Sequence, residues 1–126
     1  MSALPPFELA HPRTQLRREL VDAVLRGEKT ATAGLLEEYE AEGEQPEPVG
    51  RRCALLGYDD EPIAVVEVTE SRVIPAAEID EQFARDEGEG FETVDDWREA
   101  HERFFGRPIG PETQIVAVRF RVVEQL

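Results

Sequence analysis

The chain has 126 residues, 40% of them hydrophobic and 33% charged, which is the size and composition of one soluble globular domain. Its 28 acidic and 14 basic residues give a formal net charge of −14, so broad, non-specific binding of nucleic acids is disfavoured by repulsion of their phosphates. Hydrophobic runs are much shorter than the about 20 residues that span a bilayer, and we expect no membrane segment.

Residue types that form disulfides or bind metals are scarce. The single cysteine, Cys53, cannot form an internal disulfide, and only two histidines, His11 and His101, accompany it. The chain lacks the usual cysteine and histidine set of a zinc site, and we expect no metal and no cofactor. The N-terminal segment has neither the basic nor the apolar part of a secretory signal, so we expect a cytoplasmic location.

In chain order, the first predicted element is a helix from about Arg13 to Arg26. Apolar residues such as Leu16 recur on one helical face, and Gly27 follows as a C-terminal cap. Lys29 comes next and is the only lysine among the 14 basic residues. Only lysine, and not arginine, can lose its proton at accessible pH when desolvated, so a lone lysine can mark a place where an amine is required. Chance placement explains it equally well.

Strands are predicted in four places. The run from Thr30 to Thr32 favours a strand or a tight crossing, and the stretch from Glu37 to Pro48, rich in glutamate, indicates a short helix that runs into an exposed loop. Strands are then predicted at Arg51–Leu56, Ile63–Ile74 and Gln114–Glu124. A short loop rich in turn-forming residues joins the first two of these, so we expect them to pair antiparallel.

Two helices are predicted between the last two strands, from Pro75 to about Asp86 and from Val94 to Phe105. A capping box of Thr93 and Asp96 begins the second helix, whose apolar stripe includes Phe104. Because strands and helices do not alternate as βαβ units, and the last strand returns from a distant point in sequence, the pattern indicates an α+β fold around a small sheet or barrel.

Lys29 and Thr32 could act as a base and a nucleophile. A neutral lysine can take the proton of a threonine hydroxyl, which is the arrangement used in covalent hydrolysis. Residues an odd number apart in an extended chain point to opposite faces, so the two would meet only across a bend. A cation after a helix, followed by strand threonines, also accounts for this spacing and is favoured by the spacing alone.

Glu87 and Glu89 lie among glycines directly after a predicted helix. Glycine allows a positive φ angle and close approach of a ligand, so either carboxylate could be presented in a cleft. A solvated helix end with acidic residues is the alternative. Carboxylates at a helix C-terminus oppose the helix dipole, which calls for some other reason for their presence.

Four further residues are candidates for substrate binding. If the strand face that carries Glu67 is interior, its carboxylate needs a partner or a raised pKa. The opposite face is more uniformly apolar, and if that face is buried instead, Glu67 is exposed. Trp97 and His101 share a helix face and could stack on a nucleobase or complete a core. Arg119, with Arg121 on the same strand face, could hold a phosphate or pair with glutamates.

Together these motifs resemble the ASCH domain, a PUA-like α+β fold in which helices flank a small β-barrel of about five or six strands. The resemblance extends from about Leu16 to Val123 and is closest to the larger bacterial ASCH proteins. It is carried by GEKTATAG, EEYEAEGEQPEPVG, EPIAVVEVTESRVIP, FARDEGEG and the pattern W-R-x-x-H-x-x-F-F. It implies that residues 1–126 form a single ASCH domain.

The resemblance implies action on RNA or on modified nucleosides. Some small ASCH proteins are amidohydrolases of N4-acetylcytidine, and their catalytic residues fall on Lys29, Thr32 and Glu87. A larger member is described as a ribonuclease, so a ribonuclease or a non-catalytic RNA- or nucleotide-binding module are alternatives. The expected partner is a nucleoside or an RNA, with no DNA and no membrane, and the oligomeric state stays open.

This sequence departs from the small amidohydrolases in the acidic stretch 37–48 and in the extended helix over 97–105. Both differences could reshape the mouth of the site, so the catalytic trio can be present without the preference for acetylcytidine. A carboxylate beside an ammonium favours the charged lysine. We therefore expect Glu87 to donate a proton to the leaving amine or to orient Lys29, and we expect Lys29, Thr32 and Glu87 to converge at one cleft.

Overall fold

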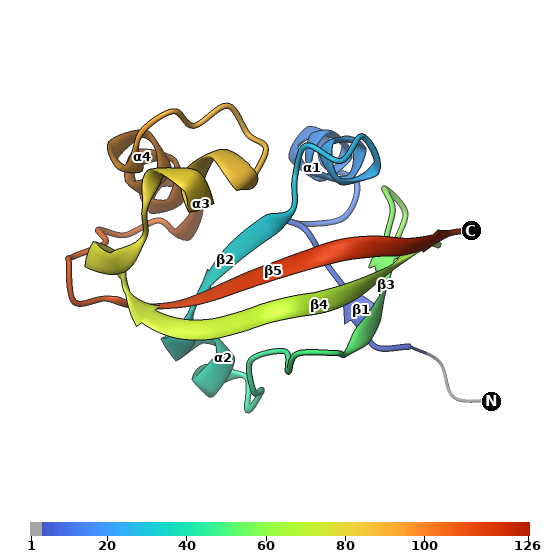
Figure 1. Cartoon of the computed structure of the whole chain (residues 1–126), viewed down its shortest axis with the longest axis horizontal. Helices are drawn as coiled ribbons and strands as arrows, with labels where there is room; N and C mark the ends of the chain where they lie inside the picture. The colour runs from blue at the N-terminus through green and yellow to red at the C-terminus, as the bar shows by residue number, and fades with distance from the viewer. Residues whose placement is uncertain (1–3) are drawn as a thin grey trace.

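A computed structural model describes residues 4–126 and shows an α+β fold (Figure 1). The strands are β1 (Pro6–Phe7), β2 (Ala31–Leu35), β3 (Arg52–Leu56), β4 (Pro62–Pro75) and β5 (Gln114–Gln125). The helices are α1 (Gln15–Leu25), α2 (Leu36–Ala41), α3 (Glu81–Asp86) and α4 (Val94–Phe105), with a short 3-10 turn, η1 (Ala76–Glu78), before α3. No helix within residues 4–126 is long and apolar enough to cross a membrane.

The strands form one mixed sheet in the order β1-β3-β4-β5-β2. β3 pairs antiparallel with β4, as the sequence predicts, β4 and β2 each pair antiparallel with β5, and β1 pairs parallel with β3. The predicted α+β class is confirmed, but the sheet is not closed into a barrel. Closure requires the two edge strands to pair, and here β1 and β2 lie at opposite ends of the sheet.

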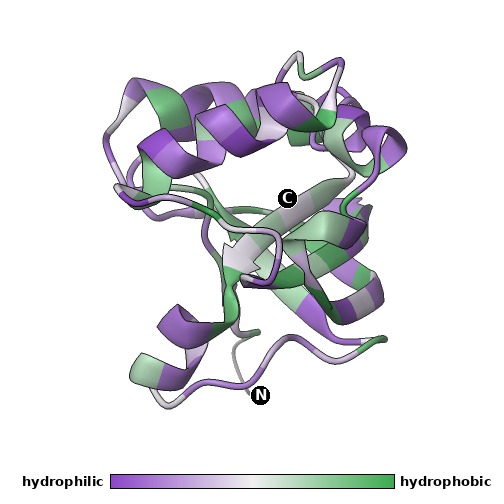
Figure 2. Cartoon of the chain, turned by 90° about the vertical axis from the view of Figure 1, so that its left-hand side faces the viewer, coloured by the Kyte–Doolittle hydropathy of each residue, from purple (hydrophilic) through white to green (hydrophobic). Residues whose placement is uncertain are grey.

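Two apolar clusters fix the helices to the sheet. One joins α3 and α4 to β2 and β5 and includes the buried residues Phe83, Trp97 and Ile115; the other joins α1 to β3 and β4 and includes Val24 and Leu55. Figure 1 shows α1 and the pair α3 and α4 on the same side of the sheet. The strands are mainly hydrophobic and the helices are striped with both kinds of residue (Figure 2), as expected for helices that cover a sheet.

Local caps explain where the long helices begin and end. The Thr14 hydroxyl accepts a hydrogen bond from the Arg17 N–H at the start of α1, and Gly27 follows the helix with a φ angle of 80°. α4 has the bounds that the sequence predicts, with the capping box of Thr93 and Asp96, and it ends at Gly106 in the left-handed conformation. Both predicted helices are therefore confirmed.

The continuous helix predicted from Pro75 to Asp86 is wrong. The structure divides this segment into η1 and α3, with extended backbone at Ile79 and Asp80. The Asp80 carboxylate accepts a hydrogen bond from the Phe83 N–H at 2.8 Å and so begins a new helix. This N-cap interrupts the helical pattern that the apolar spacing suggested.

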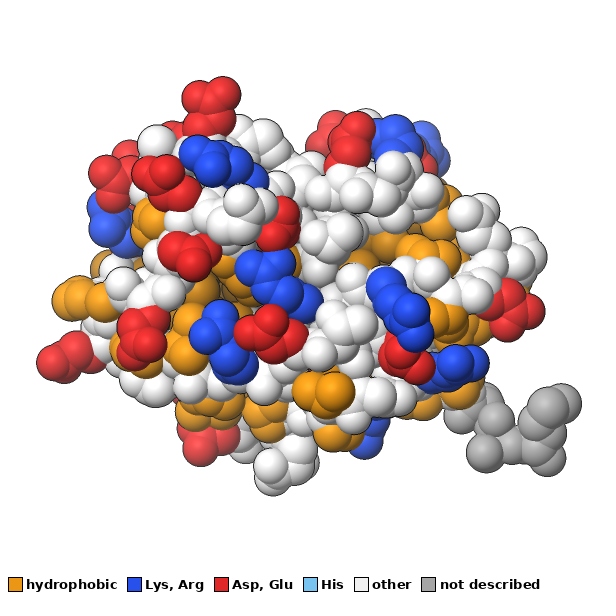
Figure 3. Space-filling model, viewed as in Figure 1, with side chains coloured by type: hydrophobic (Ala, Val, Ile, Leu, Met, Phe, Trp, Pro, Cys, Tyr) orange, Lys and Arg blue, Asp and Glu red, His pale blue; other side chains and the backbone are white. Residues whose placement is uncertain are grey.

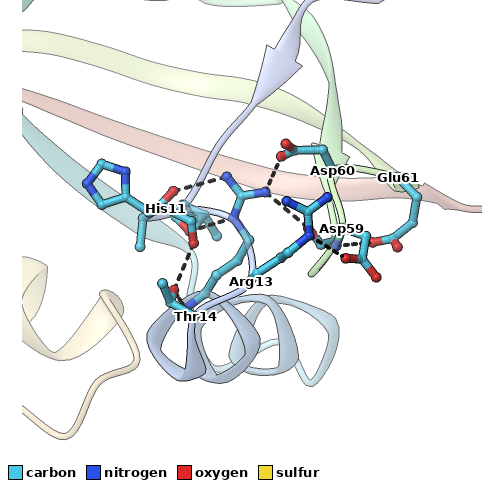
Figure 4. Close-up of polar contacts among 10 residues, drawn as sticks. His11, Arg13, Thr14, Asp59, Asp60 and Glu61 are labelled. Carbon is cyan, nitrogen blue, oxygen red and sulfur yellow. Dashed lines mark hydrogen bonds and ion pairs between the residues drawn. The ribbon is translucent and has the colours of Figure 1, made fainter.

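A buried arginine ties the segment before α1 to the loop between β3 and β4. The Arg17 side chain is 1% exposed, donates hydrogen bonds to the carbonyl oxygens of Leu9 at 3.2 Å and Gly57 at 3.0 Å, and pairs with Asp60. Figure 4 shows Asp59 and Asp60 of this loop beside the N-terminal segment. Because Leu9 also lines the cleft described next, Arg17 helps to fix one of its walls.

Candidate active site

A cleft of about 550 Å³ opens between α1 and α4. Its apolar walls come mainly from these two helices, and the outline of the molecule is notched between them (Figure 3). Polar residues from three separate segments meet in it: Lys29 and Thr32 follow α1, Glu87 and Glu89 follow α3, and His101 lies on α4. The fold thus brings the three residues Lys29, Thr32 and Glu87 to one cleft.

Close backbone contact joins the segment after α3 to the segment after α1. The Thr30 N–H donates to the Asp86 carbonyl oxygen at 2.7 Å. Gly88 has a φ angle of 70°, and a Cβ at this position would lie 2.5 Å from the Glu28 carbonyl oxygen. Only glycine fits both the conformation and the contact, and this fit sets the distance between Lys29 and the carboxylates.

The Lys29 side chain is 1% exposed and its Nζ has acceptors on several sides. Nζ donates to the carbonyl oxygen of Ala31 at 2.9 Å, to that of Glu87 at 3.2 Å, and to Oε2 of Glu89 at 3.4 Å. Three oxygen acceptors around Nζ match the three N–H donors of a lysine ammonium.

Glu87 is equally buried and contacts three donors. Its Oε1 lies 3.6 Å from the Lys29 Nζ and 3.3 Å from the His101 Nε2, and its Oε2 accepts a hydrogen bond from the Trp97 Nε1–H. Each of these donors stabilises the ionised carboxylate. Glu87 is therefore held between Lys29 on one side and the aromatic pair of α4 on the other.

His101 packs in a fixed orientation against Trp97. The two rings are stacked with centroids 4.4 Å apart, and the His101 Nδ1 lies 2.8 Å from the Trp97 carbonyl oxygen. Burial lowers the pKa of His101, but Glu87, the Trp97 carbonyl oxygen and the charge of Glu89 together outweigh burial, so the pKa is raised overall. At neutral pH a larger fraction of His101 is therefore in the charged imidazolium form than of a free histidine.

Glu89 lies on the cleft side of Lys29. Its side chain is 24% exposed, and it pairs with the Lys29 Nζ. Burial raises the pKa of Glu89, and the charge of Glu87 adds to this effect, whereas the nearby charge of Lys29 opposes it. Glu89 therefore keeps a proton to higher pH than an ordinary glutamate.

A family model of the ASCH domain matches residues 8–124, which is most of the chain. The chain belongs to the ASCH domain family. It is similar to the ASCH domain of Lactobacillus crispatus JV V101, at 28% identity and a TM-score of 0.82, over 98% of this chain and 81% of that one. A crystal structure of a protein from Enterococcus faecalis V583 is also 28% identical, with a TM-score of 0.86, over 99% of this chain and 79% of that one.

A third structure, of the hypothetical protein PH0355, shares the fold at 14% identity and a TM-score of 0.63, over 86% of this chain and 94% of that one. No match was found among curated proteins. The predicted family is thus confirmed, and the Lys29 cleft is a feature of an ASCH domain.

Glu67 lies outside the residues that line this ASCH cleft. Its strand turns Ala64, Val66 and Val68 inward, which is the apolar face that the sequence favoured. The Glu67 carboxylate accepts a hydrogen bond from Arg121 at 2.8 Å across the strand pair, and hydrogen bonds from Arg121 and Arg52 lower the pKa of Glu67. Its role in the described structure is a cross-strand ion pair.

Arg119 and Trp97 do not line the cleft either, whereas His101 does. Arg119 Nη1 lies 2.6 Å from Asp86 and its Nε lies 3.5 Å from Glu70, so its guanidinium is held by carboxylates. Trp97 is buried in the core and acts on the site only through its contacts with Glu87 and His101. Of the four predicted substrate-binding residues, the structure brings only His101 to the cleft.

The apolar lining of the cleft is not evident from the sequence. Leu16 and Phe104 belong to the apolar faces predicted for their helices, yet both are exposed and line the cleft, and Phe91 joins them there. Helical periodicity cannot separate a residue that faces a core from one that faces a cleft, because both lie on the inward side of the helix. Among residues 4–126, no group of three metal-binding side chains is close enough to hold an ion.

Proposed function

We propose that this ASCH domain is a metal-independent amidohydrolase that acts on an acylated nucleoside, using Lys29, Thr32 and Glu87. One observation carries the proposal: a buried lysine, held by a buried carboxylate, lines the same cleft as Thr32. This is the set of groups needed for an activated nucleophile without a metal.

The lining of the cleft favours a nucleoside over a polyanion. A volume of about 550 Å³ is in the range of small-molecule sites, and apolar side chains supply part of the walls. Among the lining residues, Lys29 and Arg26 are the only lysine or arginine, and Arg26 is paired with Glu28 at 3.0 Å. Four glutamates line the cleft: Glu8, Glu19, Glu87 and Glu89.

The reaction would proceed by acyl transfer to threonine. The Thr32 hydroxyl attacks the acyl carbon while Lys29, once neutral, accepts its proton; the amine leaves and an acyl ester of Thr32 forms. Water then hydrolyses the ester. Because the Lys29 ammonium of the free protein cannot accept a proton, substrate binding must first remove one from Nζ.

The ribonuclease alternative lacks comparable support. It needs a base for the 2′-hydroxyl and cations around the phosphate, and the sequence offers Lys29, Arg119 and Arg121 for these roles. Arg119 is paired with Asp86 and Glu70, Arg121 is paired with Glu67, and neither lines the cleft.

An assay with N4-acetylcytidine and other N-acylated nucleosides tests the proposal, with release of the free amine as the readout. We expect Thr32→Val, which removes the nucleophile, to lower kcat by about 1000-fold or more. Thr69→Val is the matched control, because Thr69 is exposed on β4 and does not line the cleft. Activity that survives in Thr32→Val, or that is absent from the wild-type protein for all these substrates, would refute the proposal.

A further inference from the structure

Two carboxylates flank Lys29, and they differ in what else they contact. Both line the cleft, but Glu87 is 1% exposed with donors at both oxygens, whereas Glu89 is 24% exposed. We propose that Glu89, and not Glu87, takes the proton from Lys29 and donates it to the leaving amine. The inference rests on the proposed hydrolase function and adds a catalytic residue to its site.

Glu87 is poorly placed to carry a proton. The Trp97 N–H points at its Oε2, while Nζ of Lys29 and Nε2 of His101 surround its Oε1. A proton on Oε1 would have to displace Lys29 or His101, because these two donors take up its lone pairs, and a proton on Oε2 would have to share that oxygen with the Trp97 N–H. The Glu87 side chain is 1% exposed, so it presents less surface to a ligand in the cleft than Glu89 does. Glu87 is therefore a positioning residue for Lys29 and His101.

Glu89 meets both geometric requirements of a proton carrier. Its Oε2 accepts a hydrogen bond from the Lys29 Nζ at 3.4 Å, whereas the carboxylate of Glu87 lies farther away at 3.6 Å. Its side chain is partly exposed where it lines the cleft, so the same carboxyl group can reach a bound ligand. The charged groups that face Glu89 are Lys29, Glu87 and His101; burial and the charge of Glu87 raise its pKa, Lys29 and His101 lower it, and the pKa is raised overall.

Proton transfer within this pair supplies the neutral lysine that the reaction needs. When substrate displaces water, one proton passes from the Lys29 Nζ to the Glu89 Oε2, and an ion pair becomes a neutral amine and a carboxylic acid. A water-free environment favours the neutral pair because charge separation is costly there. The net charge of the site does not change.

The first half-reaction then balances. Thr32 Oγ1 forms a bond to the acyl carbon and passes its proton to Lys29, and the C–N bond breaks as Glu89 passes its proton to the nitrogen. The products are the free amine, the Thr32 ester, a Lys29 ammonium and a Glu89 carboxylate. In the second half, Glu89 accepts a proton from the attacking water and Lys29 returns one to Thr32 Oγ1. The carboxylic acid is released, and transfer from Glu89 to Lys29 restores the ion pair.

Leaving-group dependence tests this assignment. An amide needs a proton on its leaving nitrogen, whereas p-nitrophenyl acetate releases a stable phenolate that needs none. We expect Glu89→Gln to lower kcat/KM for N4-acetylcytidine by about 100-fold or more, the scale of a lost general acid. Both substrates lose the acceptor of the Lys29 proton, but only the amide also loses the proton donor to its leaving group, so the loss for the ester should be at least about tenfold smaller. Glu87→Gln should lower both rates by the same factor, since it acts through the position of Lys29.

Glu92→Gln is the matched control, because it removes the same charge from the same loop at an exposed residue outside the cleft. It should leave both rates within about twofold of the wild type. Thermal unfolding checks that each variant is folded. If Glu87→Gln does not fold, the test rests on Glu89→Gln alone, through the ratio of its loss of activity on the amide to its loss on the ester. Equal losses in Glu89→Gln, or an amide-selective loss confined to Glu87→Gln, would overturn the inference. A wild-type protein inactive on both substrates would instead overturn the proposed function, and the inference with it.

Discussion

At the scale of single residues, Lys29 is a buried cation whose donors are all used by acceptors from the two segments that meet at Gly88. These acceptors explain why a positive charge is stable at Lys29 even if the residue has no catalytic role. A role as a base requires in addition that the Lys29 amine lose a proton. A substitution that keeps the charge and removes this ability separates the two roles.

We predict that Lys29→Arg abolishes hydrolysis while the fold and most ligand affinity are retained. Arginine keeps the positive charge beside Glu87 but does not deprotonate, and the adjoining cleft offers room for the longer side chain. Steady-state kinetics and thermal unfolding measure the two effects. Retention of more than about a tenth of the wild-type activity, a barrier increase below about 1.4 kcal/mol, would show that Lys29 supplies only charge.

His101 gives the site a defined pH dependence. Its folded pKa is raised, so protonation of His101 stabilises the folded protein fully below about pH 6.5, the value of an unfolded histidine. This contribution is lost as the pH rises through the higher folded value. The free energies of unfolding of the wild-type protein and His101→Gln should therefore differ more at pH ~5.5 than at pH ~8.5. Denaturant titrations at the two pH values measure this, and a constant difference would contradict it.

At the scale of elements, the contact between the loop after α3 and the end of α1 depends on one glycine. Gly88 and Gly90 both have positive φ angles, 70° and 86°, but only a Cβ at Gly88 would meet backbone, whereas nothing lies within 4 Å of one at Gly90. Alanine substitutions at the two positions therefore separate the free-energy cost of a positive φ angle from the cost of a steric clash with the backbone.

We predict that Gly88→Ala destabilises the protein by at least about 2 kcal/mol more than Gly90→Ala, because the second change carries only the strain of a positive φ angle. Chemical denaturation measures both. Gly88→Ala should also move the carboxylates away from Lys29 and lower any hydrolytic activity, whereas Gly90→Ala should not. Equal destabilisation by the two changes would show that the loop shifts freely and does not set the geometry of the site.

At the scale of the whole molecule, the net charge of −14 sets the expected interaction with polyanions. Acidic and basic side chains alternate over the face shown in Figure 3, and many of the arginines are paired with carboxylates. A basic surface that could offset the repulsion of RNA is not visible on this face.

We predict that binding of mixed-sequence RNA is weak and falls further as salt is added, since any attraction would come from few unpaired cations. Fluorescence anisotropy with a labelled, structured RNA at two salt concentrations measures this. Micromolar binding that persists at high salt would contradict the prediction and would return the RNA-binding alternative to consideration.

The sequence by itself determined the elements whose signals are local. α1, α4 and the pair β3 and β4 follow from apolar periodicity, capping residues and turn formers within each segment. The break of the predicted helix at Asp80 was missed because a single N-cap competes with apolar spacing. β1 was missed because a two-residue strand has no periodicity to read and depends on its partner β3.

Only the tertiary structure decided which polar residues meet. Cross-strand pairing with Arg121 turned Glu67 away from the cleft, and carboxylates of β4 and α3 held Arg119. Lys29 and Glu87 are separated by 58 positions, and they meet because Gly88 allows two backbone segments to touch. Such contacts depend on sheet register and loop packing, which combine distant parts of the chain and leave no periodic pattern in any one of them.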